Sequence, residues 1–186
     1  MRVIAGKFRS RPLHSLRGRD IRPTSDRLRE TLFNVLTAGN PQALEGSVWV
    51  DLFAGTGAVG IEAISRGASV VHFVDCSRHA AELLRKNLAS LKVQEGFQIL
   101  QQKSLHALSE LEGRNVQADF VFLDPPYEER GAYRETLDAL AASNLAKHAL
   151  VIAEHEKRFD PGERFGILQR SRKLEQGDAA LSFYRT

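Results

Sequence analysis

The sequence predicts an α/β fold in which a mostly parallel sheet carries helices on both faces, with an antiparallel strand pair near its C-terminal end. Three observations predict it. Short apolar runs alternate with segments of helical periodicity, a glycine-rich turn joins the first run to a helix, and 186 residues that are 42% hydrophobic suffice for one core. Repeated strand–helix units place their strands in parallel and their helices on the faces of the sheet.

The first 22 residues form a basic arm, which we expect to be a hairpin or loop rather than a long helix. Residues 1–30 contain nine Lys and Arg against three acids, a net charge of +6, whereas the whole chain carries +3. This uneven charge favours a polyanionic partner that binds at one end of the molecule, and a solvated basic tail is the alternative.

A helix is predicted to follow the arm. Residues 23–26, Pro-Thr-Ser-Asp, are a helix-start signal, and apolar residues with the spacing of one helical face come after them. This apolar stripe comprises Leu28, Leu32, Val35 and Leu36. We expect Arg27 and Arg29 to lie away from the stripe. The sequence therefore divides into a basic extension with its helix, residues 1–40, and a main domain, residues 41–186.

The rest of the chain is organised around residues 47–60. Val48–Phe53 is an apolar run typical of a buried parallel strand, and Gly-Thr-Gly-Ala-Val-Gly follows at residues 55–60. A strand that ends in glycines and leads into a helix presents backbone N–H groups to a bound ligand. Asp51, within the strand, would repel a phosphate held by these glycines but would suit a cation or a hydroxyl group.

Strands and helices are predicted to alternate beyond this point. In order, they are a strand at Val70–Val74, a helix at Ala80–Leu91, a strand at Phe97–Leu100, a helix ending at Leu111, a strand at Asp119–Leu123, a helix at Tyr133–Ala142, a strand at Ala149–Ala153, and strands at 165–171 and 179–185 joined by a turn at Gly177-Asp178. The last two strands are expected to form an antiparallel pair at the edge of the sheet.

The glycine pattern leaves two cofactors open. Residues 55–60 match G-x-G-x-x-G, and Asp75 follows Gly55 by about 20 residues, as in sites that bind NAD or a flavin dinucleotide. This pattern alone permits an oxidoreductase. The charge of Asp51, however, suits the sulfonium and amino-acid end of S-adenosylmethionine better than a pyrophosphate.

Asp124-Pro125-Pro126-Tyr127 is the most specific signal in the chain. Two prolines fix their φ angles and lack N–H groups, so the segment offers only carbonyl acceptors, to which Asp124 adds a carboxylate and Tyr127 a stacking ring. At the carboxyl edge of a parallel sheet, such groups suit the amino group of a planar base. Hydrogen bonds to Asp124 and to the Pro125 carbonyl would aim the amine lone pair at a methyl group. An ordinary proline turn is the alternative.

Together the motifs carry a family resemblance. Asp51-Leu-Phe-Ala-Gly-Thr-Gly with Asp124-Pro-Pro-Tyr resembles class I S-adenosylmethionine-dependent amino-methyltransferases. Met1-Arg-Val-Ile-Ala-Gly-Lys-Phe-Arg-Ser-Arg-Pro-Leu and Arg22-Pro-Thr-Ser-Asp-Arg-Leu-Arg-Glu-Thr-Leu-Phe-Asn-Val-Leu are similar to the RsmD family, bacterial 16S ribosomal RNA guanine-N2 methyltransferases. The likeness covers nearly the whole chain.

The resemblance implies a Rossmann-like class I methyltransferase fold with a seven-stranded sheet and S-adenosylmethionine as the cofactor. It implies methyl transfer to N2 of one guanine of 16S rRNA, in the small ribosomal subunit or its assembly intermediate. Asp51, Gly55 and Gly57 would line the methionine end of the cofactor, and Asp75 would accept from the ribose hydroxyls. The full predicted cofactor set comprises Asp51, Phe53, Ala54, Gly55, Thr56, Gly57, Asp75, Cys76, Ser104 and Leu105.

The resemblance also assigns the catalytic and RNA-binding residues. The catalytic set is Asp124, Pro125, Pro126 and Tyr127, of which Tyr127 would stack on the flipped base. The predicted RNA contacts are Arg9, Arg11, Arg22, Arg27 and Arg29. Two positions depart from the family pattern: Ser104 stands near where an acid often faces the adenine amine, and Asp75 stands where a Glu is more usual.

Two other functions remain open at this point. An adenine-N6 methyltransferase acting on DNA or RNA would use the same Asp-Pro-Pro-Tyr chemistry, although no extra sequence-reading domain is evident. A non-catalytic rRNA-binding assembly factor could keep the fold as a platform, but the complete glycine and Asp-Pro-Pro-Tyr motifs argue against it.

Several absences complete the expectations. The lone Cys76 excludes a disulfide framework and a cysteine-built zinc site, and the six histidines lack metal-ligand spacing, so no metal is expected. His155 could lie near the site, although we interpret it as structural. Neither a signal peptide nor a membrane-spanning run is evident, and we expect a cytoplasmic monomer.

Overall fold

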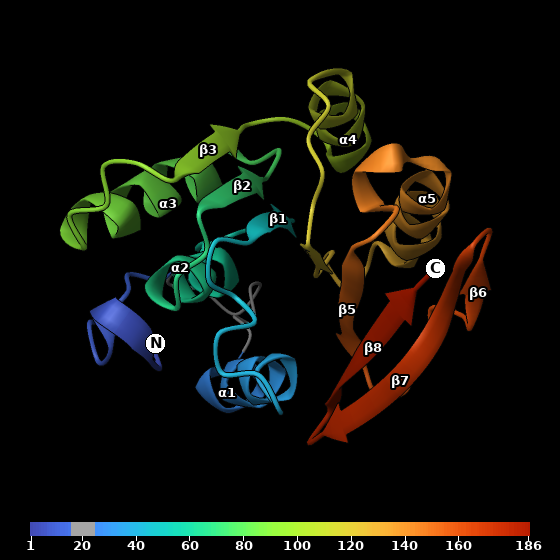
Figure 1. The fold of residues 1–186 in the computed structure, drawn as a ribbon, viewed down its shortest axis with the longest axis horizontal. Coiled ribbons are helices and arrows are strands. Elements are labelled where there is room, and N and C mark those ends of the chain that lie inside the picture. Colours follow the sequence, from blue (N-terminus) through green and yellow to red (C-terminus); the bar gives the residue numbers. More distant parts are fainter. Residues whose placement is uncertain (16–24) are drawn as a thin grey trace.

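The computed structural model describes residues 1–15 and 25–186. In this part of the chain, eight strands form one sheet with the order β3-β2-β1-β4-β5-β8-β7-β6 (Figure 1). The strands are β1 Val48–Leu52, β2 Val70–Val74, β3 Phe97–Leu100, β4 Phe120–Leu123, β5 Leu150–Glu156, β6 Arg164–Phe165, β7 Leu168–Gln176 and β8 Ala179–Arg185. The predicted α/β class with a mostly parallel sheet is confirmed.

The first five strands pair in parallel, and the last three are antiparallel. Two details differ from the sequence-based prediction. The two-residue strand β6 pairs with β7 and makes the sheet eight-stranded rather than seven-stranded. In addition, a turn at residues 166–167 divides the predicted strand 165–171 between β6 and β7, whereas the predicted antiparallel pairing with β8 is present. Two residues are too short a segment to show the alternation that marks a strand in a sequence.

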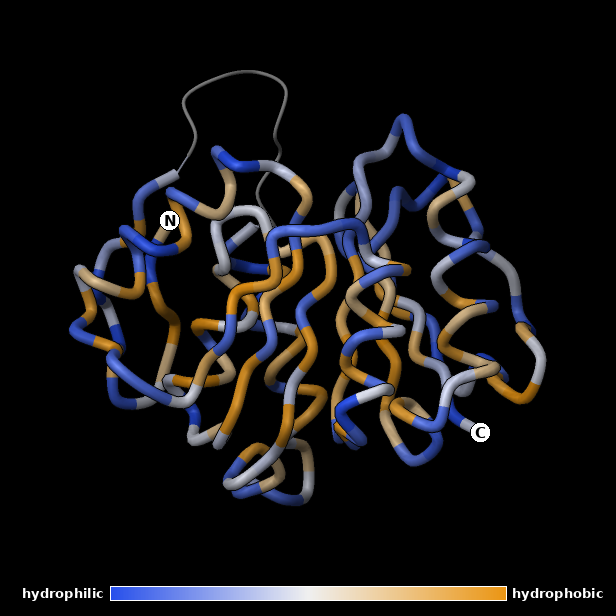
Figure 2. The backbone as a smooth tube through the Cα atoms, turned by 90° about the horizontal axis from the view of Figure 1, so that it is seen from above, coloured by the Kyte–Doolittle hydropathy of each residue, from blue (hydrophilic) through white to orange (hydrophobic). Residues whose placement is uncertain are grey.

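Helices cover both faces of the sheet. They are α1 Asp26–Leu36, α2 Ala58–Ser65, α3 Arg78–Ser90, α4 Ser104–Gly113 and α5 Arg130–Ala142, with short 3-10 helices η1 Gly6–Phe8 and η2 Asn144–Ala146. One apolar cluster joins the sheet to α1, α2, α3 and the N-terminal residues, and a second joins its other face to α4 and α5. Figure 2 shows the hydrophobic strands in the middle and hydrophilic stretches on the outer turns.

α1 begins and packs as its sequence predicts. The Ser25 hydroxyl caps it by accepting from the Leu28 N–H at 3.1 Å, and Leu28 and Leu32 are buried. Arg29 does not follow the prediction, because its side chain is 0% exposed instead of facing solvent. Its guanidinium donates to the Asp26 carboxylate at 3.0 Å and to the Arg2 carbonyl. A charged residue beside an apolar stripe becomes buried when such acceptors satisfy it.

The described part of the basic arm, residues 1–15, is a folded loop, as predicted. Backbone hydrogen bonds from Val3 to Arg11 and from Leu13 to Met1 bring its two ends together. Val3 and Leu13 belong to the apolar cluster that contains α1, α2 and α3. The arm therefore shares a core with residues of the main domain.

Candidate active site

The glycine loop after β1 is tightly wound. Phe53, Gly55 and Gly57 have φ angles of 62°, 54° and 77°, all in the left-handed region. A Cβ on Gly57 would lie 2.1 Å from the Leu84 Cδ1 atom, whereas one on Gly55 would meet only the Phe53 carbonyl at 3.9 Å. Gly57 is therefore required for packing against α3, while the Gly55 side of the loop is open towards a ligand. A left-handed bulky residue such as Phe53 is strained and typical of functional sites.

Asp51 lies buried beneath this loop. Its carboxylate accepts from the Gly60 N–H at 2.9 Å, at the start of α2. Burial above all raises the pKa of Asp51 to about 7; the hydrogen bond from Gly60 opposes this shift, and the negative charge of Asp75 adds to it. The ionised carboxylate is therefore costly without a cation beside it, and a cationic ligand would relieve that cost.

Asp75 follows β2 and ties the glycine loop to α3. One carboxylate oxygen accepts from the Gly55 N–H at 2.9 Å, and the other accepts from the Ser77 N–H at 2.8 Å. Each carboxylate oxygen has a second lone pair, so both remain able to accept from a hydroxyl. The predicted ribose contact from Asp75 is compatible with this geometry and stays a prediction.

The remaining predicted cofactor residues lie along the same edge of the sheet. Ala54 is half-buried in the loop and Thr56 is buried, whereas Cys76, after β2, is exposed. Ser104 is half-buried and Leu105 is 38% exposed, both in the first turn of α4.

The Asp124–Tyr127 turn follows β4, the neighbour of β1 in the sheet. Pro125 is buried, and the Pro126 carbonyl accepts from the Glu129 N–H at 2.8 Å, which closes the turn before α5 begins. Tyr127 is half-buried. The rigid turn therefore lies beside the glycine loop, at the carboxyl ends of adjacent parallel strands.

Three carboxylates meet at this edge. Burial raises the pKa of Asp124 well above its ordinary value, and the charges of Glu154 on β5 and of Asp51 raise it further. Each of the three residues lies two positions after a member of the apolar cluster beneath α1 and α2. Because residues two apart in a strand share a face, Asp51 in β1 and Glu154 in β5 point to the same side of the sheet, and Asp124 follows directly after β4. The prediction assigned no role to Glu154, although an acid ending an apolar strand is a visible signal.

The acceptor groups fit S-adenosylmethionine and do not fit a pyrophosphate. Asp51, Asp75 and Asp124 are acids around an open glycine loop, so they favour a ligand with positive charge and hydroxyl groups. A pyrophosphate on the same loop would bring further negative charge beside Asp51, whose ionised form is already costly. The structural chemistry of this edge thus argues against the dinucleotide alternative.

The predicted RNA-binding arginines are distributed unevenly. Arg9, Arg11 and Arg27 are exposed, and Arg22 lies outside the described residues. Arg29 is fully buried, which is inconsistent with its predicted RNA contact. Burial lowers the pKa of Arg29, against the opposing influence of Asp26 and Glu62. Its Nε and Nη1 atoms are buried and have no hydrogen-bond partner. The side chain therefore lies in the interior of the protein, away from any RNA.

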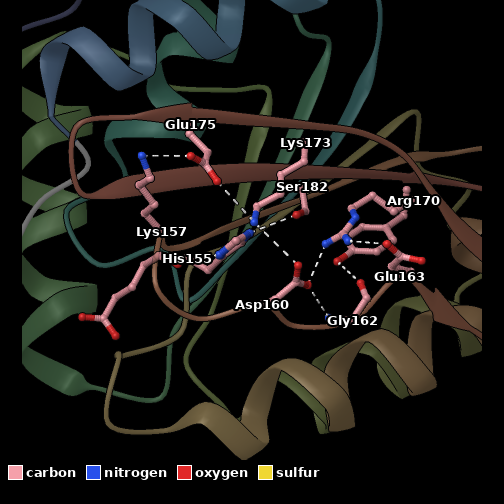
Figure 3. A network of polar contacts seen from close by, with 11 residues as sticks. His155, Lys157, Asp160, Gly162, Glu163, Arg170, Lys173, Glu175 and Ser182 are labelled. Carbon is pink, nitrogen blue, oxygen red and sulfur yellow. Dashed lines mark hydrogen bonds and ion pairs between the residues drawn. The ribbon is translucent and has the colours of Figure 1, made fainter.

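His155, next to Glu154, has a structural environment, as interpreted from the sequence. It is fully buried, its Nε2 atom lies 2.9 Å from the Ser182 hydroxyl, and burial lowers its pKa. Figure 3 shows the surrounding network, in which Asp160 is paired with Arg170 at 2.6 Å and with Lys173 at 3.6 Å. These contacts fasten the segment after β5 to β7 and so support the strand that carries Glu154.

Two buried polar residues behind the glycine loop escaped the prediction. Glu62, in α2, and Asn87, in α3, are both fully buried. Each had a signal in the sequence: Glu62 is an acid inside the apolar helix Ala58–Ser65, and Asn87 lies on the buried face of α3 beside Leu88. A polar residue on an apolar face indicates a specific partner inside the fold.

Two other kinds of site are absent from the described part of the chain. Within residues 1–15 and 25–186, no group of three or more His, Cys, Asp or Glu is placed to hold a metal ion. Over the same ranges, no helix has the length and apolar character needed to cross a membrane.

Comparisons with known proteins identify a family and several relatives. The family model described as "Conserved hypothetical protein 95" matches residues 1–185. Ribosomal RNA small subunit methyltransferase D of Haemophilus influenzae is 38% identical over 159 residues, which cover 84% of this chain and 79% of that protein. The YlbH protein of Bacillus subtilis is 33% identical over 190 residues, covering 100% of this chain and 98% of that one.

A solved structure resembles the whole chain. The yhhF protein of Escherichia coli superposes with a TM-score of 0.82 at 33% identity, covering 99% of this chain and 96% of that one.

Proposed function

The chain belongs to the RsmD family, and from that membership we propose that it transfers a methyl group from S-adenosylmethionine to the N2 amine of one guanine in 16S ribosomal RNA. The coarser part of this proposal, methylation of ribosomal RNA, is supported by relatives that bear the name ribosomal RNA small subunit methyltransferase D. The finer part, guanine N2, rests on the resemblance to the RsmD family, because the Asp124–Tyr127 turn would hold the amine of adenine as well as that of guanine.

One observation carries the proposal. The Asp124–Tyr127 turn and the glycine loop with Asp51 follow adjacent parallel strands, β4 and β1, whose residues Leu123 and Leu52 are paired. The Asp124–Tyr127 turn thus lies beside the loop that we propose binds the cofactor, at the carboxyl edge of the sheet, where open α/β sheets bind their ligands. A methyl donor and an amine acceptor need such a pair of neighbouring sites.

The proposed cofactor is held by charge and by hydrogen bonds. Asp51 binds its amino-acid end, which Gly55 and Gly57 line, Asp75 accepts from its ribose hydroxyls, and Leu105 packs on its adenine. S-adenosylmethionine supplies an electrophilic methyl group on a sulfonium centre. The raised pKa of Asp51 fits this role, because a buried carboxylate gains most from a positive ligand.

The acceptor amine is held by the turn. Asp124 and the Pro125 carbonyl accept its N–H bonds, which keeps the nitrogen lone pair out of the ring and directs it towards the methyl carbon. Tyr127 stacks on the base. The amine proton leaves after the nitrogen–carbon bond forms, when the nitrogen is most acidic, and Asp124 or water accepts it.

The exposed arginines form the proposed RNA contact. Arg9 and Arg11 on the arm and Arg27 on α1 are free of the core, so their side chains can approach phosphate groups. The proposed substrate is 16S rRNA in the small subunit or in an assembly intermediate, without a metal ion. The division into residues 1–40 for RNA contact and 41–186 for catalysis is part of the same proposal.

The decisive experiment measures labelled methyl transfer from S-adenosylmethionine onto small ribosomal subunits that lack the modification, followed by identification of the nucleoside. We expect N2-methylguanosine with the wild-type chain and no product with Asp124→Ala, while that variant still binds S-adenosylhomocysteine. Glu128→Ala, on the exposed part of the same turn, is the matched control. N6-methyladenosine as product, or near wild-type turnover of Asp124→Ala, would contradict the proposal.

A further inference from the structure

The N-terminal arm, defined as residues 1–15, is fixed to the helices that follow the glycine loop and β2. Figure 1 shows it in blue beside α2. The Glu62 carboxylate accepts from the N–H groups of Ile4 at 2.7 Å and Ala5 at 2.9 Å. The Ser65 hydroxyl accepts from the Phe8 N–H at 3.0 Å. Buried side chains thus bind the backbone of the arm, independently of its side chains.

Gly6 allows this close approach. Its φ angle is 78°, and a Cβ at this position would lie 1.9 Å from the Ser65 carbonyl oxygen. Only glycine fits between the arm and α2 here, because both the backbone conformation and the contact exclude a side chain. The docked position of the arm is therefore specific to one conformation.

Asn87 connects the arm to the glycine loop. Its Oδ1 atom accepts from the His14 N–H at 2.7 Å, and its Nδ2 group donates to the His14 carbonyl at 3.1 Å. The same Nδ2 group donates to the Thr56 carbonyl at 2.9 Å. One fully buried amide thus holds the far end of the arm and the middle of the loop proposed to bind the cofactor. Neither segment can shift relative to the other without loosening one of its hydrogen bonds to Asn87.

We propose that Asn87 is a positioning residue that couples the arm to the glycine loop, so that RNA bound to the arm tightens binding of the cofactor. This inference rests on the proposed function, because it takes RNA and S-adenosylmethionine as the two ligands. It adds to that function an energetic link between their sites.

The physical basis of the coupling is that RNA and the cofactor restrain two segments, the arm and the glycine loop, that Asn87 connects. Arg9 and Arg11 are exposed on the arm, and the Arg11 guanidinium also donates to the Ser90 carbonyl at the end of α3 at 3.2 Å. Phosphates bound to these arginines restrain the arm in its docked position. A restrained His14 keeps Asn87 in place, and Asn87 then holds the Thr56 carbonyl. Linkage makes the effect reciprocal, so the cofactor also tightens binding of RNA.

Calorimetry of S-adenosylhomocysteine binding tests this coupling. The full chain is titrated alone and in the presence of a saturating, short, guanine-containing single-stranded RNA. We expect the RNA to lower the dissociation constant of the wild type by about 5-fold or more, the lower end of ordinary coupling between sites. In Asn87→Ala the ratio of the two constants is expected to fall to about 1. Glu82→Ala, on the exposed face of α3, should keep the wild-type ratio.

The ratio separates coupling from a merely structural role. A variant that is only less stable binds both ligands less well, but its ratio stays at the wild-type value. If Asn87→Ala does not fold, His14→Pro removes the N–H donor from the arm side and leaves the buried amide in place. Its expected ratio falls below the wild-type value without reaching 1, because the His14 carbonyl still accepts from Asn87, and circular dichroism establishes that it is folded.

The outcomes distinguish this inference from the proposed function. A wild-type chain that binds both ligands with a ratio of 1 overturns the coupling and leaves the methyltransferase proposal standing. A wild-type ratio retained in the folded Asn87→Ala or His14→Pro variant overturns the role of Asn87. A wild-type chain that does not bind S-adenosylhomocysteine overturns both.

Discussion

Replacing Asp51 by Asn should stabilise the ligand-free protein, and the stabilisation should grow as the pH rises. Burial raises the pKa of Asp51 from 3.8 to about 7 in the folded protein. A carboxyl with a raised pKa contributes most to stability below its unfolded value, and this contribution is lost as the pH rises through the folded value. The side-chain amide of the Asp51→Asn variant does not titrate, so the variant escapes this loss.

The magnitude follows from the pKa. Of the range from pH 5 to pH 8, about two pH units lie below the folded pKa of Asp51, which is about 7. Over these two units the folded chain holds a proton on Asp51 that the unfolded chain has lost, and each pH unit changes the free energy of unfolding by about 1.4 kcal/mol. The advantage of the variant should therefore increase by about 3 kcal/mol over this range. In the variant the Gly60 N–H donates to the amide oxygen of Asn at both pH 5 and pH 8. Any change in the strength of this hydrogen bond therefore cancels when the two pH values are compared.

Urea unfolding followed by circular dichroism at pH 5 and pH 8 measures this difference, with Asp178→Asn in the exposed β7–β8 turn as the control. The same variant should bind S-adenosylhomocysteine about 10-fold more weakly, because the buried negative charge that binds the ammonium group is gone. Parallel pH profiles of unfolding for Asp51→Asn and the wild type would refute the argument that Asp51 is held at a cost in the absence of a cation.

Three further predictions concern other parts of the molecule. Replacing Arg9 and Arg11 together by Ala should weaken RNA binding and reduce the slope of log binding constant against log salt concentration by about 1.5, since each phosphate contact contributes about 0.7 to 0.9. An unchanged slope would show that both arginines are solvated and do not contact phosphates. Gly57→Ala should lower the free energy of unfolding by about 2 kcal/mol, through its left-handed φ and its clash with Leu84, and a loss below about 0.5 kcal/mol in thermal unfolding would contradict this. Arg29→Ala should lower the free energy of unfolding in urea by about 3 kcal/mol. If Arg29→Met is no more stable than Arg29→Ala, the aliphatic part of the Arg29 side chain contributes no packing.

The strand–helix order was predictable from the sequence because its elements carry clear periodicity. The strands Val70–Val74 and Phe97–Leu100 agree with the predicted bounds, and the helix after the glycine loop begins where the motif indicates. Residues in such buried parallel strands are nearly all apolar, so the signal is strong. That the glycine loop and the Asp124 turn lie at the same carboxyl edge followed from the parallel topology, whereas the pairing of β1 with β4 came from the structure.

The partners of buried polar residues could not be predicted in the same way. Arg29, Glu62 and Asn87 bind backbone groups of residues that are distant in sequence, such as Arg2, Ile4 and His14. Periodicity reports which face a residue lies on, but it does not report which segment covers that face. Arg29 was for this reason assigned to solvent and RNA, although its guanidinium lies inside the fold.

The position of β8 has a consequence for biosynthesis. The parallel strands β1 to β5 emerge from the ribosome before Ala179–Arg185, yet β5 and β7 both need that segment as their neighbour. Until it arrives, β5 presents an unpaired edge whose inner residues are buried in the finished protein. Nascent chains that stall just short of this strand should therefore be the aggregation-prone species, and ones in which it has emerged should acquire protease resistance in a single step.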